Sequence, residues 1–479
     1  MVKKDDLLKS VRMQQRDISV QISKEKFKKL HHRKIYYDII DRVDKFIESE
    51  EYPNRFITMP GLRGLGKSTI IYQIYDYLIN EKGIEADDIL YLDVDELLLN
   101  FNTDIKTVFE VFLEYYHNTI PVALEKKLFI LIDEAQFDKN WAQFAKILFD
   151  KTSNIFMFFT GSCALELESN TDAIRRMKMQ HIYPMNFKEY LLLNYGIDIA
   201  EYDIRNLLFD CTEENVEKAR IMEKKLSNIL INLNNDPQLE LKKFTQAYSF
   251  PFALNEDISD IHEDISEVVR RIIKDDLVGF KSYNKVSSHT INQIISFLAT
   301  KKPGKTKNAT IAQSTEISAN TIKEILGVLE LTQLIFSICA YGPGGKILKN
   351  SKEHFFITSN IKASFNYRLG RYDINEDQCY SILVENRVAS NLYYLIKKTS
   401  DSIGLFYDAD RRGVDFIIKY DDNVIPIEVG IGKKTKSQLT LASRKYNSKY
   451  SILVSNRTET IEFVNNILYI PLLTFALMT

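Results

Sequence analysis

A glycine-rich run near the start of the chain has the spacing of a phosphate-binding loop. The run reads Gly61-Leu62-Arg63-Gly64-Leu65-Gly66-Lys67-Ser68-Thr69. An apolar segment, 56–59, precedes it and apolar residues at helical spacing follow it, so the loop is expected between a strand and a helix. We expect Gly61 and Gly66 to let the backbone curl so that main-chain amides and the start of the helix hold a triphosphate. Lys67 then neutralises the β and γ phosphates and Ser68 binds Mg²⁺, which predicts binding of ATP or GTP.

A second motif follows a strand that the sequence predicts to be buried on both faces. Five apolar residues, 128–132, lead directly into Asp133 and Glu134, and an uninterrupted apolar run is typical of the centre of a parallel sheet. Ligands of open α/β sheets bind at the carboxyl ends of the strands. We therefore expect Asp133 to bind Mg²⁺ and Glu134 to polarise the attacking water. Two solvated acids after a strand are the alternative interpretation.

The strands around these motifs favour an ATPase. One strand, 89–93, lies between the phosphate loop and the acidic motif, as in P-loop ATPases with an additional strand. The chain contains no Asn-Lys-x-Asp run for guanine, which favours ATP. The strand after the acidic motif, 155–159, leads into Thr160 and Ser162. Both side chains are candidates to contact the γ-phosphate or the water, with a plain turn as the alternative.

Arginines are the remaining candidates for the hydrolysis step. Arg175 and Arg176 precede a predicted strand at 181–185, and an arginine that reaches the developing phosphate charge raises turnover by about 10³–10⁵. Such an arginine acts either on the nucleotide of its own chain or on that of a neighbouring chain. The second case requires a homo-oligomer. A solvated helix end is the alternative for the pair. Arg63 in the loop has a comparable claim, with packing as its alternative.

Length and charge exclude several classes of protein. The 479 residues allow about three domains. A net charge of −2 excludes bulk attraction to nucleic acid and leaves only local basic patches. The 4 cysteines show no paired spacing, so neither a disulfide framework nor a zinc site is indicated. No stretch approaches about 18 uncharged apolar residues, so we expect a cytoplasmic protein without a membrane partner.

The chain is predicted to be an α/β protein of five segments. A polar tail and a helix make up 1–50, and the P-loop ATPase domain with its parallel sheet spans 51–195. A helical segment, 196–285, is the expected lid over the nucleotide. Three short helices and a strand pair within 286–358 are typical of a winged helix. The last segment, 359–479, is predicted to be a small α/β domain.

Two features of the later segments concern DNA. The third helix of the winged-helix segment carries Asn320, Thr321 and Lys323 beside two glutamates, and the basic loop 301–307 comes before it. Direct DNA contact and a packing domain clamped to the ATPase both fit this pattern. A second basic run follows Glu428, and such a run attracts phosphates, although a solvated helix face is the alternative. Its members are Lys433, Lys434, Lys436, Arg444, Lys445, Lys449 and Arg457.

Three carboxylates of the last segment are candidates for a second metal site. Asp415 and Glu428 are expected on neighbouring strands of one hairpin, and Glu385 on a helix before them. Carboxylates meeting in this way bind Mg²⁺ through oxygen. A bound Mg²⁺ is the metal half of a phosphodiester-cleaving site, where it activates water and stabilises the leaving oxygen.

The motifs together resemble a prokaryotic family. The phosphate loop, the acidic motif, Thr160-Gly161-Ser162, residues 183–190 and the strands within 414–429 occur in the same order as in AAA-like, STAND-related ATPases with a winged helix and a C-terminal restriction-endonuclease-like domain. The resemblance implies nucleotide chemistry at Lys67, Ser68, Asp133 and Glu134, and a nuclease-like core at Asp415 and Glu428. It also implies a role in DNA transactions or in defence against mobile elements. Gly430 replaces the family's lysine two residues after the strand glutamate, which favours a degenerate domain that binds nucleic acid or assembles the protein.

Three functions therefore compete. The first is an ATPase with Mg²⁺ whose hydrolysis cycle moves the winged-helix and C-terminal parts on DNA. The second is an ATP-gated, metal-dependent DNA nuclease that uses the three carboxylates. The third is a slow ATP switch that works through protein contacts.

Overall fold

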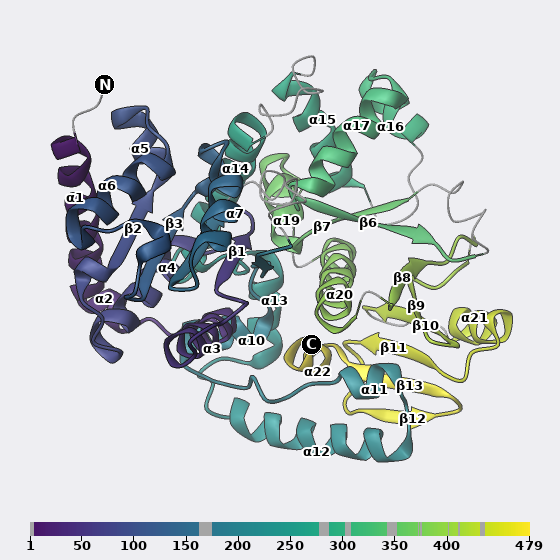
Figure 1. Ribbon diagram of the computed structural model, residues 1–479. Helices are drawn as coiled ribbons and strands as arrows, with labels where there is room; N and C mark the ends of the chain where they lie inside the picture. Colours follow the sequence, from purple (N-terminus) through teal and green to yellow (C-terminus); the bar gives the residue numbers. More distant parts are fainter. Residues whose placement is uncertain are drawn as a thin grey trace. The chain divides into compact units, whose positions relative to one another are not determined.

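The chain divides into two units, Met1–Tyr183 and Pro184–Thr479, both drawn in Figure 1. The computed structural model describes residues 4–161, 175–276, 287–301, 308–342, 352–371, 373, 376–400, 402–410, 412–431 and 436–479. In these ranges no helix combines the length and the apolar character that a membrane crossing requires.

Five parallel strands form the sheet of the first unit. They are β1 Phe56–Pro60, β2 Ile89–Asp93, β3 Leu128–Asp133, β4 Ile155–Gly161 and β5 Lys178–Met179. Their order in space is β2-β3-β4-β1-β5, so β4 lies between the strand before the phosphate loop and the strand before the acidic motif. The predicted strand 89–93 is present as β2, and the parallel sheet that the sequence predicts is confirmed.

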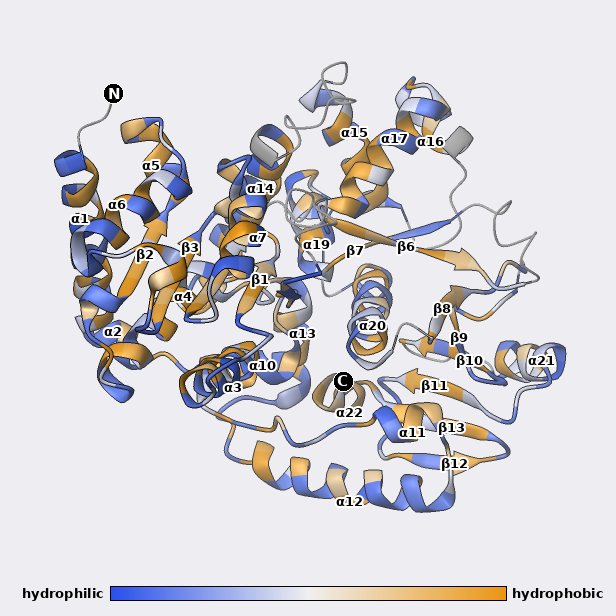
Figure 2. Ribbon diagram, in the orientation of Figure 1, coloured by the Kyte–Doolittle hydropathy of each residue, from blue (hydrophilic) through white to orange (hydrophobic). Residues whose placement is uncertain are grey.

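Apolar runs explain why these segments lie at the centre of the unit. Every residue of β1, β3 and β4 is buried, and Figure 2 shows strands of this sheet in hydrophobic colours. Full burial of one such side chain contributes about 1.5–3 kcal/mol. The helices of the unit are α1 Lys4–Ser23, α2 Glu25–Lys28, α3 Lys34–Glu48, α4 Lys67–Asp76, α5 Val94–Phe101, α6 Ile105–His117 and α7 Trp141–Lys151.

The helix α1 covers the outer edge of the sheet. Its apolar residues recur at helical spacing, and Leu7, Leu8 and Val11 join the core of the unit. The side-chain amide of Gln15 donates a hydrogen bond of 2.7 Å to the carbonyl of Ile89 in the end strand β2. The prediction of a polar tail was therefore wrong for this segment, because a sparse apolar stripe was hidden among charged residues.

The second unit has an eight-stranded mixed sheet. Its order is β12-β13-β11-β10-β9-β8-β6-β7. The strands are β6 Ile335–Ala340, β7 Glu353–Phe356, β8 Gly404–Tyr407, β9 Phe416–Tyr420, β10 Asn423–Gly430, β11 Ser451–Ser455, β12 Glu462–Val464 and β13 Ile467–Pro471. The helices are α10 Phe187–Tyr195, α11 Arg205–Phe209, α12 Glu213–Leu230, α13 Pro237–Gln246, α14 Ile258–Arg271, α15 Ser288–Thr300, α16 Asn308–Thr315, α17 Ala319–Leu331, α19 Ser359–Arg368, α20 Asp377–Thr399, α21 Ser437–Tyr446 and α22 Leu472–Met478.

The predicted elements of the second unit are present, but one sheet runs through them. Four helices, α11 to α14, occupy the segment expected to be helical, whose role as a lid stays a prediction. The expected three helices and strand pair are α15, α16, α17, β6 and β7. Because β6 also pairs in parallel with β8, the sheet continues across the predicted boundary at 358. Residues 302–307 of the basic loop lie outside the described residues.

Candidate nucleotide-binding site

The phosphate loop lies where β1 meets α4. Gly64 and Gly66 have φ of 80° and 85°, which only glycine adopts without strain. Gly61 does not share this left-handed conformation. Instead, a Cβ at Gly61 would lie 2.4 Å from the side chain and 2.6 Å from the carbonyl oxygen of Ile182. This glycine is needed because a neighbouring segment packs against it.

Lys67 begins α4 and extends over the loop. Its ammonium donates hydrogen bonds of 3.0 Å to the carbonyls of Gly61 and Leu62, and only 5% of the residue is exposed. Among the described residues no side chain caps α4 at Gly66, so the first amides of the helix point toward an anion without competition from a cap. Leu62 and Leu65 are buried and anchor the loop from below.

Three oxygen-bearing side chains converge where β3 and β4 end. The hydroxyls of Ser68 and Thr160 both hydrogen-bond the carboxylate of Asp133. Asp133 is 2% exposed and Thr160 is fully buried. Burial raises the pKa of Asp133 and the charge of Glu134 adds to this, whereas Ser68, Thr160 and Lys67 oppose it. Hard oxygen ligands from Ser68 and Asp133 fit Mg²⁺, which keeps several waters and takes few protein ligands.

Glu134 has an unusual backbone and a specific partner. Its φ is 53°, a left-handed conformation that costs a non-glycine residue of order 1 kcal/mol. The side-chain amide of Gln136 donates a hydrogen bond of 2.5 Å to the Glu134 carboxylate. The Glu134 amide in turn donates to Asp133 at 3.1 Å and to Thr160 at 3.4 Å. Glu134 is thus fixed beside the predicted metal ligand, and sequence reasoning gave Gln136 no role.

Arg33, which no sequence motif indicated, supports the loop. It is 7% exposed, and its guanidinium donates hydrogen bonds of 2.9 Å to the carbonyl of Leu65 and 2.8 Å to that of Tyr183. The planar fork of the guanidinium suits two acceptors at fixed spacing. A single arginine before a helix carries no pattern that distinguishes it from a surface residue, so the signal exists only in the folded chain.

The arginine pair lies at the opposite edge of the sheet. Arg176 donates a hydrogen bond of 2.8 Å to Asp150 near the end of α7, and both arginines precede the start of β5, which is parallel to β1. In a parallel sheet the start of one strand lies far from the carboxyl ends of its neighbours. Neither Arg175 nor Arg176 therefore reaches the nucleotide site of its own chain in this structure. Ser162 lies outside the described residues, and Arg63 is half-buried in the loop.

The structure brings two of the three C-terminal carboxylates together. The amide of Val429 donates a hydrogen bond of 2.8 Å to Asp415, and the amide of Asp415 donates one of 3.3 Å to Glu428. Within the described ranges, however, no group of three His, Cys, Asp or Glu side chains is arranged to hold a metal. Glu385 instead lies near the buried ammonium of Lys362 and opposes the lowering of its pKa. The predicted three-carboxylate metal site is not formed there.

The C-terminal basic run is also partly neutralised. Lys445 forms ion pairs of 2.9 Å with Asp408 and 2.8 Å with Asp410. Both aspartates lie in an earlier segment of the chain, outside the basic run. Lys433 and Lys434 lie outside the described residues. The run is therefore less positive than its sequence indicates.

Comparisons with known proteins agree with this geometry. A family model described as an AAA domain matches residues 53–191. An uncharacterized protein of Methanocaldococcus jannaschii is 33% identical over 446 residues, which cover 92% of this chain and 88% of that protein. An uncharacterized protein of Haemophilus influenzae is 25% identical over 416 residues, with coverage of 84% and 89%. Among solved structures, a Walker-type ATPase of Pyrococcus abyssi is similar with a TM-score of 0.40 and 12% identity, over 71% of this chain and 97% of its own.

Proposed function

This chain belongs to the same family as its Methanocaldococcus jannaschii relative, with an AAA-like P-loop ATPase domain, and on that premise we propose that it binds and hydrolyses ATP with Mg²⁺. One observation carries the proposal: Lys67, Ser68, Asp133, Glu134 and Thr160 come together at the carboxyl ends of β1, β3 and β4. Three separate segments of sequence contribute to this cluster, and it holds the groups that phosphoryl transfer to water requires.

Each side chain has a role in the proposed reaction. The main-chain amides of the loop and the start of α4 hold the triphosphate, and the Lys67 ammonium neutralises its outer phosphates. Mg²⁺, held by Ser68 and Asp133, would offset the charge of the phosphates. Glu134 accepts a proton from the attacking water. Thr160 fixes the Asp133 carboxylate through its hydroxyl and positions the Glu134 amide.

Two variants test the proposal. Lys67→Ala should weaken ATP binding about 100-fold, because charge-assisted contacts to two phosphates are lost. Glu134→Gln should keep ATP binding in calorimetry and lower turnover by about 10²–10⁴-fold. Glu125→Gln is the matched control, since Glu125 is exposed shortly before β3 begins, at the far end of the same strand. Turnover by Glu134→Gln at the wild-type rate would refute the catalytic assignment.

We further propose that the nucleotide cycle moves the second unit on DNA. Three helices followed by the antiparallel pair β6 and β7 support a winged helix there, and Lys436, Arg444, Lys449 and Arg457 offer positive charge near the C-terminus. ATP turnover with and without duplex DNA tests this part. Unchanged turnover, together with no binding of the duplex, would leave an ATPase that does not act on DNA.

A slow ATP switch is the second candidate. It is favoured by the hydrogen bond between Gln136 and Glu134, because an amide donor stabilises the charged carboxylate and makes it a weaker base. Single-turnover kinetics distinguish the two functions. A bound ATP that persists for many minutes in the presence of DNA would support the switch, whereas rapid multiple turnover would exclude it.

A further inference from the structure

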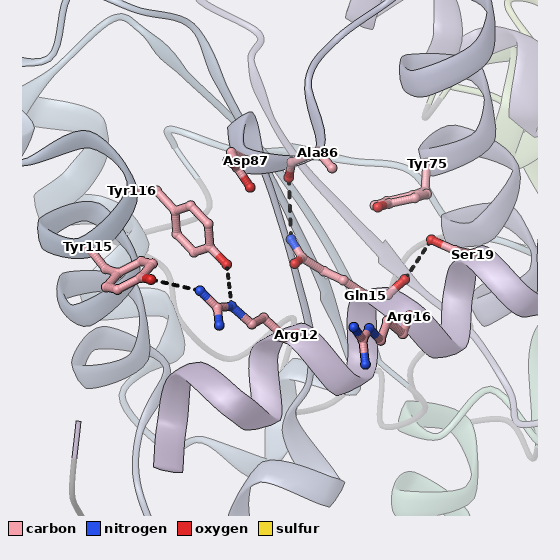
Figure 3. Close-up of a pocket in the computed structure, with 9 residues that line it drawn as sticks. All are labelled: Arg12, Gln15, Arg16, Ser19, Tyr75, Ala86, Asp87, Tyr115 and Tyr116. Carbon is pink, nitrogen blue, oxygen red and sulfur yellow. Dashed lines mark hydrogen bonds between the residues drawn. The ribbon is translucent and has the colours of Figure 1, made fainter. Parts of the chain in front are cut away.

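A cleft in the first unit lies beside α1, away from the phosphate loop. Its volume is about 610 Å³, which is within the usual range for small-molecule sites. It is lined by Arg12, Gln15 and Arg16 of α1, Tyr115 and Tyr116 of α6, and Tyr75 of α4. Figure 3 shows α1 along one side of this α1 cleft and the segment with Ala86 and Asp87 along the other.

Two guanidinium groups face the α1 cleft, and neither has a carboxylate partner among the described residues. Arg12 and Arg16 are four residues apart, and two like charges at this spacing destabilise a helix unless something compensates them. Arg16 is exposed and, within the described chain, makes no hydrogen bond or ion pair. In the part of the chain that the structure describes, Arg12 hydrogen-bonds two phenol oxygens and no carboxylate: those of Tyr115 at 2.8 Å and Tyr116 at 3.3 Å. The two guanidinium groups therefore form a positively charged patch that can bind an anion.

The hydrogen-bonding groups of the α1 cleft are mainly donors. Each phenol accepts from Arg12 and keeps its own O–H as a donor. The Nη1 nitrogen of Arg12 has no partner among the described residues, and all donors of Arg16 remain. One carboxylate, that of Asp87, lines the cleft, and it can accept from an amine or a hydroxyl. An anionic group with a few donors of its own fits this inventory.

The aromatic side chains add a preference for a flat ring. Tyr115 is 54% exposed, so its ring is accessible to a ligand, and the Arg12 guanidinium lies 5.2 Å from its centroid. Tyr115 and Tyr116 meet edge to face with centroids 5.0 Å apart. An exposed ring backed by a guanidinium is a platform on which a nucleobase stacks. Phosphate groups and stacked bases occur together in nucleotides.

We propose that the α1 cleft binds a nucleotide unit, with its phosphate on Arg12 and Arg16 and its base on Tyr115. The unit comes either from a free mononucleotide or from a single-stranded nucleic acid, since both present the same groups. The site is separate from the phosphate loop. Tyr75 borders the cleft and lies eight residues after Lys67 on α4, so about 12 Å of rigid helix joins the two sites.

The test measures binding of fluorescein-labelled dT10 by anisotropy in the Lys67→Ala background, in which the phosphate loop binds nucleotide only weakly and does not compete. Arg16→Ala should weaken binding about tenfold, and Tyr115→Ala about tenfold, whereas Tyr115→Phe should stay near wild type because the ring remains. Arg16→Ala should also reduce the slope of log affinity against log salt by about 0.7, the value for one lost phosphate contact to a single strand. Competition by unlabelled AMP identifies a free nucleotide as a ligand, and its failure identifies the strand.

Two matched variants control for general effects. Lys9→Ala removes one exposed, unpaired positive charge from the same helix, and Tyr37→Ala removes a ring that is 57% exposed on α3. Both should bind dT10 as wild type does, with the same salt slope. The proposal is overturned if neither dT10 nor AMP binds, if Arg16→Ala and Tyr115→Ala bind like wild type, or if Lys9→Ala weakens binding as much as Arg16→Ala. Loss of ATP hydrolysis in Lys67→Ala tests the phosphate-loop site and leaves the proposal for the α1 cleft unaffected.

Discussion

The amide of Gln136 donates a hydrogen bond of 2.5 Å to the carboxylate of Glu134, two residues before it. This bond holds the predicted general base in a left-handed turn with φ of 53°. A base whose charge is stabilised by a donor takes a proton less readily, so under the proposed mechanism this hydrogen bond should slow ATP hydrolysis.

Loss of the hydrogen bond between Gln136 and Glu134 should raise the basal rate of ATP turnover. We expect Gln136→Ala to hydrolyse ATP severalfold faster than wild type with little change in ATP affinity, because Gln136 contacts the base and not the phosphate-binding loop. Steady-state phosphate release measures the effect, and Gln136→Glu should reproduce it, because this change also removes the donor and adds a like charge that makes the Glu134 carboxylate a stronger base. A drop of more than tenfold in Gln136→Ala would show that Gln136 positions Glu134 for the reaction.

The close packing of Ile182 against Gly61 leads to a second prediction. Gly61→Ala should destabilise the protein by about 1–3 kcal/mol, as overpacking does, and should weaken ATP binding more than tenfold. The added Cβ would meet the backbone of Ile182, which is itself hydrogen-bonded to Pro60. Gly327→Ala on α17 is the control, because nothing lies within 4 Å of its added Cβ. That variant should be stabilised by about 0.5–1 kcal/mol; equal thermal shifts in the two variants would contradict this account.

Arg33 should matter for ATP affinity although it precedes the loop by many residues. We expect Arg33→Met to weaken ATP binding about tenfold, since the loop carbonyl of Leu65 loses a charged donor. Arg33→Lys should not rescue it, because one ammonium does not reproduce a fork that reaches two carbonyls. Calorimetry with Lys34→Ala, an exposed neighbour, provides the baseline. Wild-type affinity in Arg33→Met would show that the loop holds its shape unaided.

A buried lysine in the second unit predicts a pH dependence of stability. Lys362 is 3% exposed, donates to the carbonyls of Leu298 and Lys301, and burial lowers its pKa to about 8. Because the unfolded chain keeps this proton up to about pH 10.4, folding becomes more favourable as pH rises from about 8 toward 10. The gain is about 3 kcal/mol at most. Chemical denaturation of wild type and Lys362→Met should show this rise in wild type alone, and parallel pH profiles would refute it.

The buried strands and the phosphate loop could be predicted because their signals are local. Uninterrupted apolar runs at 128–132 and 155–159 require burial on both faces, and a loop with lysine and serine after glycines restricts the backbone to few conformations. The acids at the end of β3 follow from the same rule, since strand ends carry the ligands.

The rest depends on contacts between distant segments. Arg33 reaches Leu65 and Tyr183, and Asp408 neutralises Lys445, across separations that no local pattern encodes. Arg175 and Arg176 show that residue type alone does not fix a position. Their residue type suits a developing charge, but their place before the start of a parallel strand puts them at the edge of the sheet away from the nucleotide site of their own chain. Likewise Glu385 has the right chemistry and a different neighbour, Lys362.

The glutamines of α1 have a consequence for solubility. Gln15 occupies the carbonyl of Ile89, and Gln14 accepts from the amide of Asp93, so backbone groups at both ends of β2 already have partners. An uncovered end strand invites another chain to add a strand of its own, which leads to aggregates. Helix α1 therefore leaves fewer backbone groups of β2 available for pairing with a strand of another molecule.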